Sequence, residues 1–333
     1  MSAVPEYEEL VAPPHPVKPA SRIAVWTALA VVYVVWGSTF VGVRVTVESM
    51  PPQMTAGLRC VAAVPFVALL VVWRRGWRAL LVSPRELGSA AVVGTLLLGI
   101  CNSSVALGVR FVPSGVAALI LASIPVFVVM LRAASGDRPG WITWLGVAVG
   151  LGGVVWLMLP GAHITGLDGV SVHQRVIWSV VMLVGSLAWA VGTWLSPRLT
   201  TPADPMVGST YQLLIGGSLI LVAGFLRGER ASALLDVTPR SWVAFAYLVL
   251  AGSVLAFSAY VWLVDHAPIS LVSTYAYVNP VVAVALASLI VGEPITSGLL
   301  VGGAVVVVGV ALVVGGERRA APAPVDAEGT SPT

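Results

Sequence analysis

A small set of aromatic, amide and hydroxyl side chains interrupts the otherwise apolar stretches of this 333-residue chain. The stretch STYAYVNPVV (residues 273–282) places two tyrosines and an asparagine in one apolar run, and YVVWGSTF (residues 33–40) places a tryptophan and hydroxyls in another. Such groups are unfavourable against lipid, so they indicate contact with a polar solute or a hydrogen bond to a neighbouring helix. The candidate solute-binding residues are Trp36, Ser38, Asn102, Ser123, Trp189, Tyr275, Tyr277 and Asn279.

Some of these candidates have a second interpretation. Trp36 and Trp189 are also the kind of residue that packs between helices or forms an aromatic belt at the membrane surface. Asn102 is the kind of residue that joins two helices by a hydrogen bond. The sequence leaves both alternatives open.

Arg59 is the one cation inside an apolar stretch. It lies six residues beyond Gln53, roughly 9 Å deep at a rise of 1.5 Å per residue. The sequence favours a side chain that extends back to the membrane surface or pairs with Glu48. The alternative is that Arg59 binds the carboxylate of a solute.

Pro125 and Pro280 lie inside two apolar stretches. They predict kinks, because proline removes one helix hydrogen bond. At about 100° per residue, Tyr277 shares the face of Pro280, whereas Tyr275 and Asn279 fall on nearly the opposite face. The two faces cannot both line one cavity. We predict that the face with Tyr277 lines it.

Ionisable groups of the kind that enzymes use are missing from the middle of the apolar stretches. Carboxylates and histidines lie in tails, loops or the ends of these stretches, and no phosphate-binding glycine loop is present. This pattern argues against an enzyme, and no cofactor or metal site is expected. Cys60 and Cys101 are interpreted as small buried hydrophobic residues. The net charge of +3 gives no indication of nucleic-acid binding.

The elements that position these residues are long apolar segments. The chain is 58% hydrophobic and 10% charged, against the roughly 25% charge of soluble domains. We therefore predict an all-α polytopic membrane protein in a lipid bilayer, with ten transmembrane helices. The predicted spans are 23–43, 53–73, 87–109, 112–133, 141–159, 175–196, 205–226, 241–264, 267–290 and 297–315.

Lysine and arginine near the span ends predict the orientation. With the N-terminus inside, eleven such residues lie inside and six outside. The positive-inside rule then places both termini in the cytoplasm. Residues 1–22 and 317–333 are predicted to be disordered cytoplasmic tails.

Residues 23–160 and 161–316 form an internal repeat. Trp36 corresponds to Trp189 at an offset of 153 residues, and a matched proline pair follows at an offset of 155. Five spans is an odd number, so the two halves enter the membrane from opposite sides. Inverted repeats of this kind are typical of secondary transporters, whose two halves open a central site to each side in turn.

Glycines recur without polar companions in spans five and ten. They are Gly146, Gly150, Gly153, Gly302, Gly303 and Gly309. Small residues at such spacing allow close helix contact, either within one chain or in a homodimer.

Four segments, VVWGSTF, ESMPPQMTAGLR, VPSGVAALILASIPVF and TYAYVNPVVAV, together resemble the EamA family of the drug/metabolite transporter superfamily. The likeness covers about residues 21–316, in two EamA repeats. It implies a central cavity built from spans one to four and six to nine, with spans five and ten at the periphery. The family motif positions present here are Trp36, Gly37, Ser38, Arg59, Pro125, Asn279 and Pro280. Glu293 matches the acidic loop residue of the family, and its first-half counterpart, Asp137, stands where glutamate is more frequent.

These features predict a secondary transporter of the bacterial inner membrane that works by alternating access. It would export a small organic, amino-acid-like metabolite or a drug, by a facilitated or weakly proton-coupled route. The direction of transport rests on the resemblance alone. The alternative is an importer, or a carrier of anionic metabolites that uses Arg59. A lipid-modifying enzyme and a non-transporting membrane scaffold are disfavoured.

Overall fold

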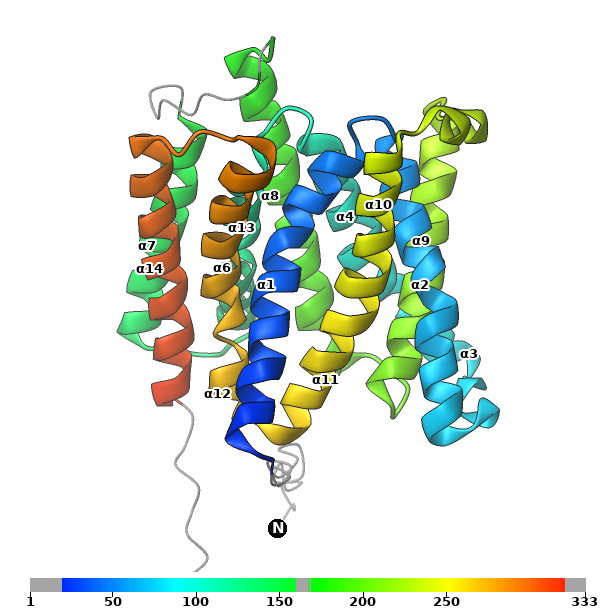
Figure 1. The fold of residues 1–333 in the computed structure, drawn as a ribbon. Coiled ribbons are helices and arrows are strands. Elements are labelled where there is room, and N and C mark those ends of the chain that lie inside the picture. Colours follow the sequence, from blue (N-terminus) through cyan, green and yellow to red (C-terminus); the bar gives the residue numbers. More distant parts are fainter. Residues whose placement is uncertain (1–19, 160–166, 168, 321–333) are drawn as a thin grey trace, which may run out of the picture.

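The computed structural model describes residues 20–159, 167 and 169–320, and it is an all-helical bundle (Figure 1). Within these residues, nine helical segments are long and apolar enough to cross a membrane, and Tyr275–Val291 is a shorter apolar helix. The expected all-α polytopic membrane fold is thereby confirmed. Most of the two predicted disordered tails, residues 1–19 and 321–333, lies outside the described residues.

Six spans are single helices: α1 (Arg22–Thr46), α2 (Pro52–Arg75), α7 (Trp141–Met158), α8 (Val172–Leu195), α9 (Pro205–Leu226) and α14 (Ser297–Ala320). Their starts follow from local chemistry, because α2 and α9 begin with proline, which needs no hydrogen-bond acceptor at that position. Ser171 caps α8 in a reciprocal capping box with Gln174. Helix α14 continues to Ala320, so residues 317–320, which were expected in the tail, are helical.

The other four spans are interrupted, in repeat-related pairs. Spans three and eight each contain a π-helical segment: α3 (Pro84–Gly94), η3 (Thr95–Ile100) and α4 (Cys101–Gly108), and α10 (Pro239–Tyr247), η7 (Leu248–Leu255) and α11 (Ala256–His266). Spans four and nine are each broken into two helices: α5 (Ser114–Leu121) and α6 (Ile124–Ala134), and α12 (Ile269–Val272) and α13 (Tyr275–Val291). Short 3-10 segments lie in the connections: η2 (Trp77–Leu80), η5 (Ser196–Arg198) and η6 (Ala231–Asp236).

The two prolines of spans four and nine stand differently relative to these breaks. Pro125 is the second residue of α6 and directly follows the break. Pro280 lies inside α13, and the break in its span comes earlier, at Ser273 and Thr274. The interruption of span nine therefore does not coincide with its proline.

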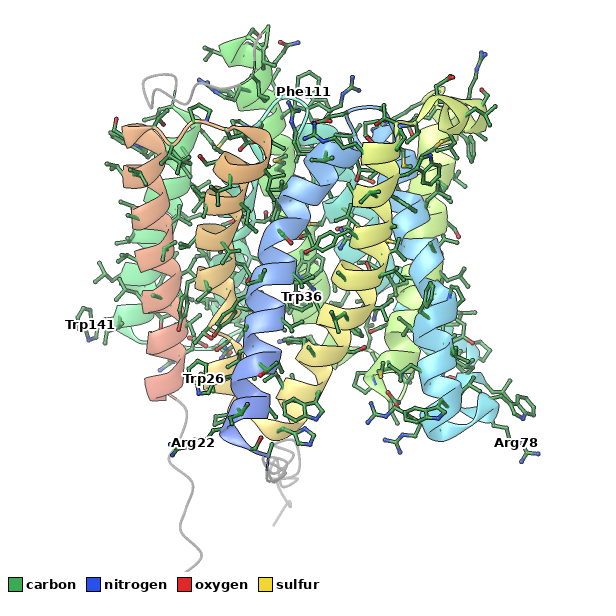
Figure 2. All side chains as sticks on the ribbon, in the orientation of Figure 1. Arg22, Trp26, Trp36, Arg78, Phe111 and Trp141 are labelled. Carbon is green, nitrogen blue, oxygen red and sulfur yellow. The ribbon has the colours of Figure 1, made fainter. Side chains whose placement is uncertain are left out.

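The first described helix starts and the last one ends at the same end of the bundle, called here the termini end; the opposite end is the distal end. Helix α7 ends and α8 begins at the distal end, so the two halves run in opposite directions (Figure 1). Figure 2 shows Trp26 and Trp141, together with Arg22 and Arg78, at the termini end and Phe111 at the distal end. Exposed tryptophan beside arginine is typical of a membrane–water interface.

Helices α7 and α14 pack against each other through their glycines. A Cβ added to Gly146 would lie 2.6 Å from the backbone nitrogen of Val313, and one added to Gly309 would lie 2.3 Å from that of Gly150. These distances leave no room for a side chain. The glycines therefore serve contact within one chain, and they are not free to form the homodimer interface that their spacing also allowed.

A buried apolar cluster, called here the distal core, joins the two halves toward the distal end. Its members include Val43, Val47, Val109, Val112, Val116, Met182 and Leu248. They come from the C-terminal end of α1, the connection between α4 and α5, and helices α5, α8 and η7. These buried side chains fill the space between the two halves toward that end.

Candidate functional site

A cavity of about 1260 Å³ lies between the two halves. Its polar and aromatic lining includes Trp36, Thr39, Thr55, Arg59, Asn102, Trp189, Thr193, Ser209, Gln212, Ser253, Tyr260, Tyr275 and Asn279. Helix α7 contributes no lining residue, and α14 contributes three near its C-terminal end: Val313, Val314 and Glu317. The lining thus comes mainly from spans one to four and six to nine.

The cavity reaches the termini end, where its lining is charged. Arg132 forms an ion pair with Asp137, with Nε and Oδ2 2.7 Å apart, and a second with Glu317. Both acidic residues line the cavity, together with Arg138. These groups form the mouth of the cavity, at the opposite end of the bundle from the distal core.

Three aromatic side chains form one wall. The ring of Trp36 lies 5.2 Å from that of Tyr260 and 5.3 Å from that of Tyr275, between ring centroids, and the two tyrosine rings lie 5.7 Å apart. Two of the three contacts are edge-to-face, a favourable geometry for aromatic pairs. The indole Nε1 of Trp36 donates a hydrogen bond to the carbonyl of Gly252 at 3.2 Å. The helices α1, η7, α11 and α13 are joined at this wall.

Arg59 lies in the cavity lining, so the expectation that it extends to the surface or pairs with Glu48 was wrong. Its Nε donates a hydrogen bond to Ser253 Oγ at 3.1 Å. Glu48 instead pairs with Arg240, at 3.5 Å between Oε2 and Nη1. Among the described residues, no carboxylate forms an ion pair with Arg59. The physical reason is that η7 brings a hydroxyl acceptor next to α2 inside the bundle.

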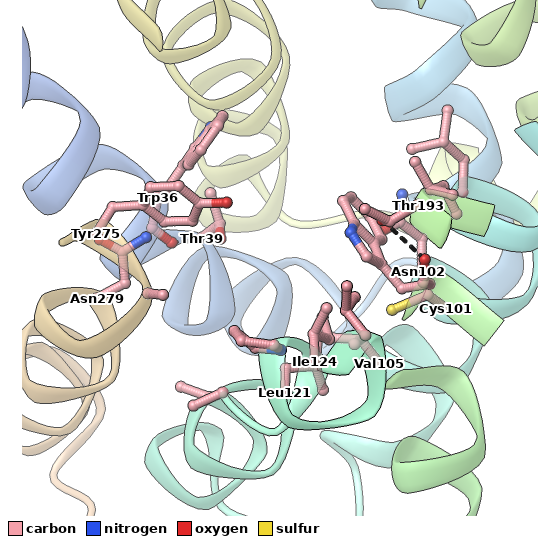
Figure 3. A pocket seen from close by; sticks show the side chains of 18 of the residues that line it. Trp36, Thr39, Cys101, Asn102, Val105, Leu121, Ile124, Thr193, Tyr275 and Asn279 are labelled. Carbon is pink, nitrogen blue, oxygen red and sulfur yellow. Dashed lines mark hydrogen bonds between the residues drawn. The ribbon is translucent and has the colours of Figure 1, made fainter. Parts of the chain in front are cut away.

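Two amides occupy different walls. In Figure 3, Asn279 lies beside Trp36 and Tyr275, and Asn102 lies across the cavity near Thr193. The Asn279 side-chain oxygen is buried and has no hydrogen-bond partner in the described part of the chain. Asn102 Nδ2 contacts Cys60 Sγ at 3.7 Å. Asn279 therefore lies at the aromatic wall with a buried acceptor that no described protein group pairs.

Three of the predicted residues do not line the cavity. The Ser38 hydroxyl donates to the carbonyl of Val35 and also bonds Tyr247 Oη, and the Ser123 hydroxyl donates to the carbonyl of Ile120. Tyr277 packs against the distal core. The prediction that Tyr277 faces the cavity was therefore wrong.

The cavity side of span nine is the face with Tyr275 and Asn279. The rotation of about 100° per residue correctly predicted that Tyr275 and Asn279 lie on the face opposite to Tyr277. It could not predict which of these two faces lines the cavity.

The prolines Pro125 and Pro280 both line the cavity, as do Trp36 and its repeat counterpart Trp189. The counterpart of Arg59 at the same offset of 153 is Gln212, which lines the cavity too.

Sequence reasoning missed Gln212, Tyr260 and Ser253. Gln212 was detectable from the repeat offset, and Tyr260 as a tyrosine within an apolar stretch. Ser253 had no such signal, because serine is common in membrane helices.

Residues 22–159 and 176–315 match the EamA-like transporter family. The chain is 35% identical over 272 residues to "Uncharacterized inner membrane transporter YedA" of Escherichia coli (strain K12), which covers 81% of this chain and 83% of that protein. It is 25% identical over 285 residues to "Uncharacterized transporter sll0355" of Synechocystis, which covers 80% and 82%. A solved crystal structure superposes with a TM-score of 0.60 at 18% identity, over 90% of this chain and 100% of that chain, and so shares the fold. The chain therefore belongs to the EamA-like transporter family and is a multi-pass membrane transporter, not an enzyme.

Proposed function

We propose that this transporter exports a small amino-acid-like solute by alternating access. The observation that carries the proposal is the cavity between two inverted halves, with a charged mouth at the termini end and the distal core at the other. Ligand pockets for small molecules typically measure roughly 300–1,000 Å³, so this cavity has room for such a solute with some water. An open cavity also argues against a non-transporting scaffold.

The lining favours a solute with a carboxylate and either an amino group or an aromatic ring. Arg59 has no carboxylate partner among the described residues, and an unpaired guanidinium in a partly buried cavity binds a carboxylate strongly. The aromatic wall of Trp36, Tyr260 and Tyr275 suits an aromatic ring of the solute, or a cationic group of the solute above a ring face. Asn279 also lines the cavity, and its oxygen, which is buried without a described protein partner, suits a donor such as an ammonium group once the side chain turns toward the solute.

The proposed location is the bacterial inner membrane with both termini in the cytoplasm. The excess of lysine and arginine on the termini side supports this orientation. In that orientation, the cavity faces the cytoplasm, which is the state in which an exporter loads its solute.

Flux in proteoliposomes tests the proposal. L-phenylalanine is a suitable probe, because it carries a carboxylate, an ammonium group and an aromatic ring. The purified full-length protein should release preloaded L-phenylalanine faster than protein-free vesicles, both with and without a pH gradient. Strict dependence on the gradient would contradict the facilitated or weakly proton-coupled route. An absence of flux would contradict the proposed solute class.

A carrier of anionic metabolites is the second candidate, and the position of Arg59 in the cavity favours it more than the sequence did. The two candidates differ in their need for the amino group. An anion carrier should move 3-phenylpropionate at least as fast as L-phenylalanine, whereas the proposed exporter should prefer L-phenylalanine.

A further inference from the structure

We propose that Gly252 and Ser253, two consecutive residues of the π-helical segment η7, position Arg59 and Trp36 and thereby set specificity for carboxylate-bearing solutes. The proposal rests on the proposed function, because it concerns the same cavity. It assigns the specificity to a backbone irregularity and to two small residues, rather than only to the side chains that contact the solute.

Ser253 works as an oriented acceptor for Arg59. In η7, the Ser253 hydroxyl donates to the carbonyl of Leu248, five residues earlier, at 3.2 Å. Because its hydrogen points to Leu248, the Ser253 oxygen is left to accept from Arg59 Nε at 3.1 Å. A chain of two hydrogen bonds thus runs from the guanidinium through the hydroxyl to the backbone.

This chain leaves the end of the guanidinium available to a solute. Within the part of the chain that the structure describes, Nη1 and Nη2 of Arg59 have no hydrogen-bonding protein acceptor, and neither nitrogen is among the buried unpartnered atoms. Arg59 lines the cavity. With Nε occupied, Nη1 and Nη2 form the edge that can bind both oxygens of one carboxylate.

Gly252 allows the close approach and fixes the indole. A Cβ at this position would lie 3.2 Å from Arg59 Nη2 and 3.2 Å from Thr39 Cγ2, so each group would have to shift by a few tenths of an ångström. The Gly252 carbonyl accepts the hydrogen bond from Trp36 Nε1. One turn of η7, in the second half, therefore forms hydrogen bonds to Trp36 and Arg59, two cavity residues of the first half.

The repeat-related segment η3 lacks this arrangement. Gly99 and Ile100 occupy the positions that correspond to Gly252 and Ser253 at the offset of 153. A Cβ on Gly99 would meet no atom closer than 3.7 Å, which is ordinary contact, and Ile100 has no hydroxyl. The irregularity is shared by both halves, but the positioning function belongs to η7.

The first test is chemical and needs no solute. Arg59 in the purified full-length protein is modified with phenylglyoxal, and the rate is followed by peptide mass spectrometry. Ser253→Ala should raise the modification rate of Arg59 several-fold, because the guanidinium loses its fixed partner. Ser253→Thr keeps the hydroxyl, so the modification rate of Arg59 should stay close to that in the protein without substitutions.

Ser209→Ala is the matched control, because Ser209 also lines the cavity but, within the described part of the chain, bonds only the carbonyl of Pro205 on its own helix. It should leave the rate at Arg59 unchanged. An unchanged rate in Ser253→Ala, or an equal increase in Ser209→Ala, would overturn the positioning role.

The second test measures specificity by calorimetric titration of L-phenylalanine and of phenethylamine, which lacks the carboxylate. Ser253→Ala should weaken L-phenylalanine binding by about tenfold, the usual size for loss of one hydrogen bond to a charged group. Gly252→Ala keeps the backbone carbonyl but places a Cβ 3.2 Å from Arg59 Nη2, so it should weaken L-phenylalanine binding by displacing the guanidinium. Phenethylamine binding should change less than twofold, and Gly99→Ala should change neither. Equal losses for both ligands would contradict the specificity claim.

The two tests separate the inference from the proposed function. If the unmodified protein shows no preference for L-phenylalanine over phenethylamine, the proposed solute class and the specificity claim fail. The phenylglyoxal rates then still decide whether Ser253 positions Arg59.

Discussion

The two halves of this transporter share a backbone plan but differ in what they present to the cavity. Around the break in span four, the cavity residues are apolar, such as Leu121, Ala122 and Ile124, whereas span nine presents Tyr275 and Asn279. The two π-helical segments differ in the same way, since among the described residues η7 alone carries side-chain hydrogen bonds to cavity residues of the other half. The repeat thus accounts for the shared architecture, and the residues that differ between its two copies account for the different chemistry of the lining.

The two ends of the bundle differ as well. At the distal end, Glu293 accepts hydrogen bonds from the backbone and hydroxyl of Ser114 and from the backbone of Gly115, at 2.7–3.1 Å, and is 8% exposed. Its counterpart Asp137, at the termini end, has a side chain that is 49% exposed and pairs with Arg132 at the cavity mouth. At the distal end, the residue at this loop position therefore caps the N-terminus of α5. At the termini end, the equivalent residue lines the mouth of the cavity.

The largest effect is expected at the pair Arg59 and Gln212. Arg59→Gln makes the first half resemble the second at this position, and it removes the cavity cation. L-phenylalanine binding should fall by about 10- to 100-fold, because hydrogen bonds to charged groups contribute roughly 1.5–3 kcal/mol. Calorimetric titration measures the change, and Gln212→Ala should weaken binding by less than threefold. A larger loss in Gln212→Ala would reverse the assignment of the two walls.

The next effect concerns the two acidic loop residues. Glu293→Gln should lower the free energy of unfolding by about 1–2 kcal/mol, because a buried charged cap of the α5 N-terminus becomes neutral. Asp137→Asn breaks an exposed ion pair and should change stability by less than about 1 kcal/mol. Thermal unfolding in detergent compares the two, and equal losses would show that the two ends are not distinguished in this way.

The smallest effect is expected at Asn279. Asn279→Leu removes a buried oxygen without a hydrogen-bond partner, so the ligand-free protein should unfold at an equal or slightly higher temperature. The same change should weaken L-phenylalanine binding about threefold to tenfold while affecting 3-phenylpropionate less. Asn102→Leu on the opposite wall is the control. A stability loss in Asn279→Leu would mean that the amide has a structural partner.

Much of the fold follows from sequence, because span length and apolar composition depend directly on the thickness of the bilayer. The repeat offsets also predict which residues occupy equivalent places. The π-helical segments have no such signal, since a hydrogen bond to the fifth rather than the fourth residue leaves the apolar pattern almost unchanged.

The site is predicted less well, because a side chain's role depends on the helix across from it. The sequence predicted that Arg59 reaches the membrane surface, because it does not reveal that η7 places Ser253 beside the guanidinium. Tyr275 and Tyr277 could be assigned to opposite faces but not to a cavity. Similarly, the glycines of α7 and α14 predicted close contact without naming the partner.

The central claim is that the cavity is the solute path and opens to each side of the membrane in turn. Thr39 lines the cavity, and its hydroxyl bonds only the carbonyl of Trp36 among the residues that the structure describes. Thr39→Cys, with Cys60 and Cys101 replaced by alanine, therefore provides a reporter. A membrane-impermeant thiol reagent should label it from the termini side without solute, and added L-phenylalanine should increase labelling from the distal side. Labelling from a single side under all conditions would contradict the account.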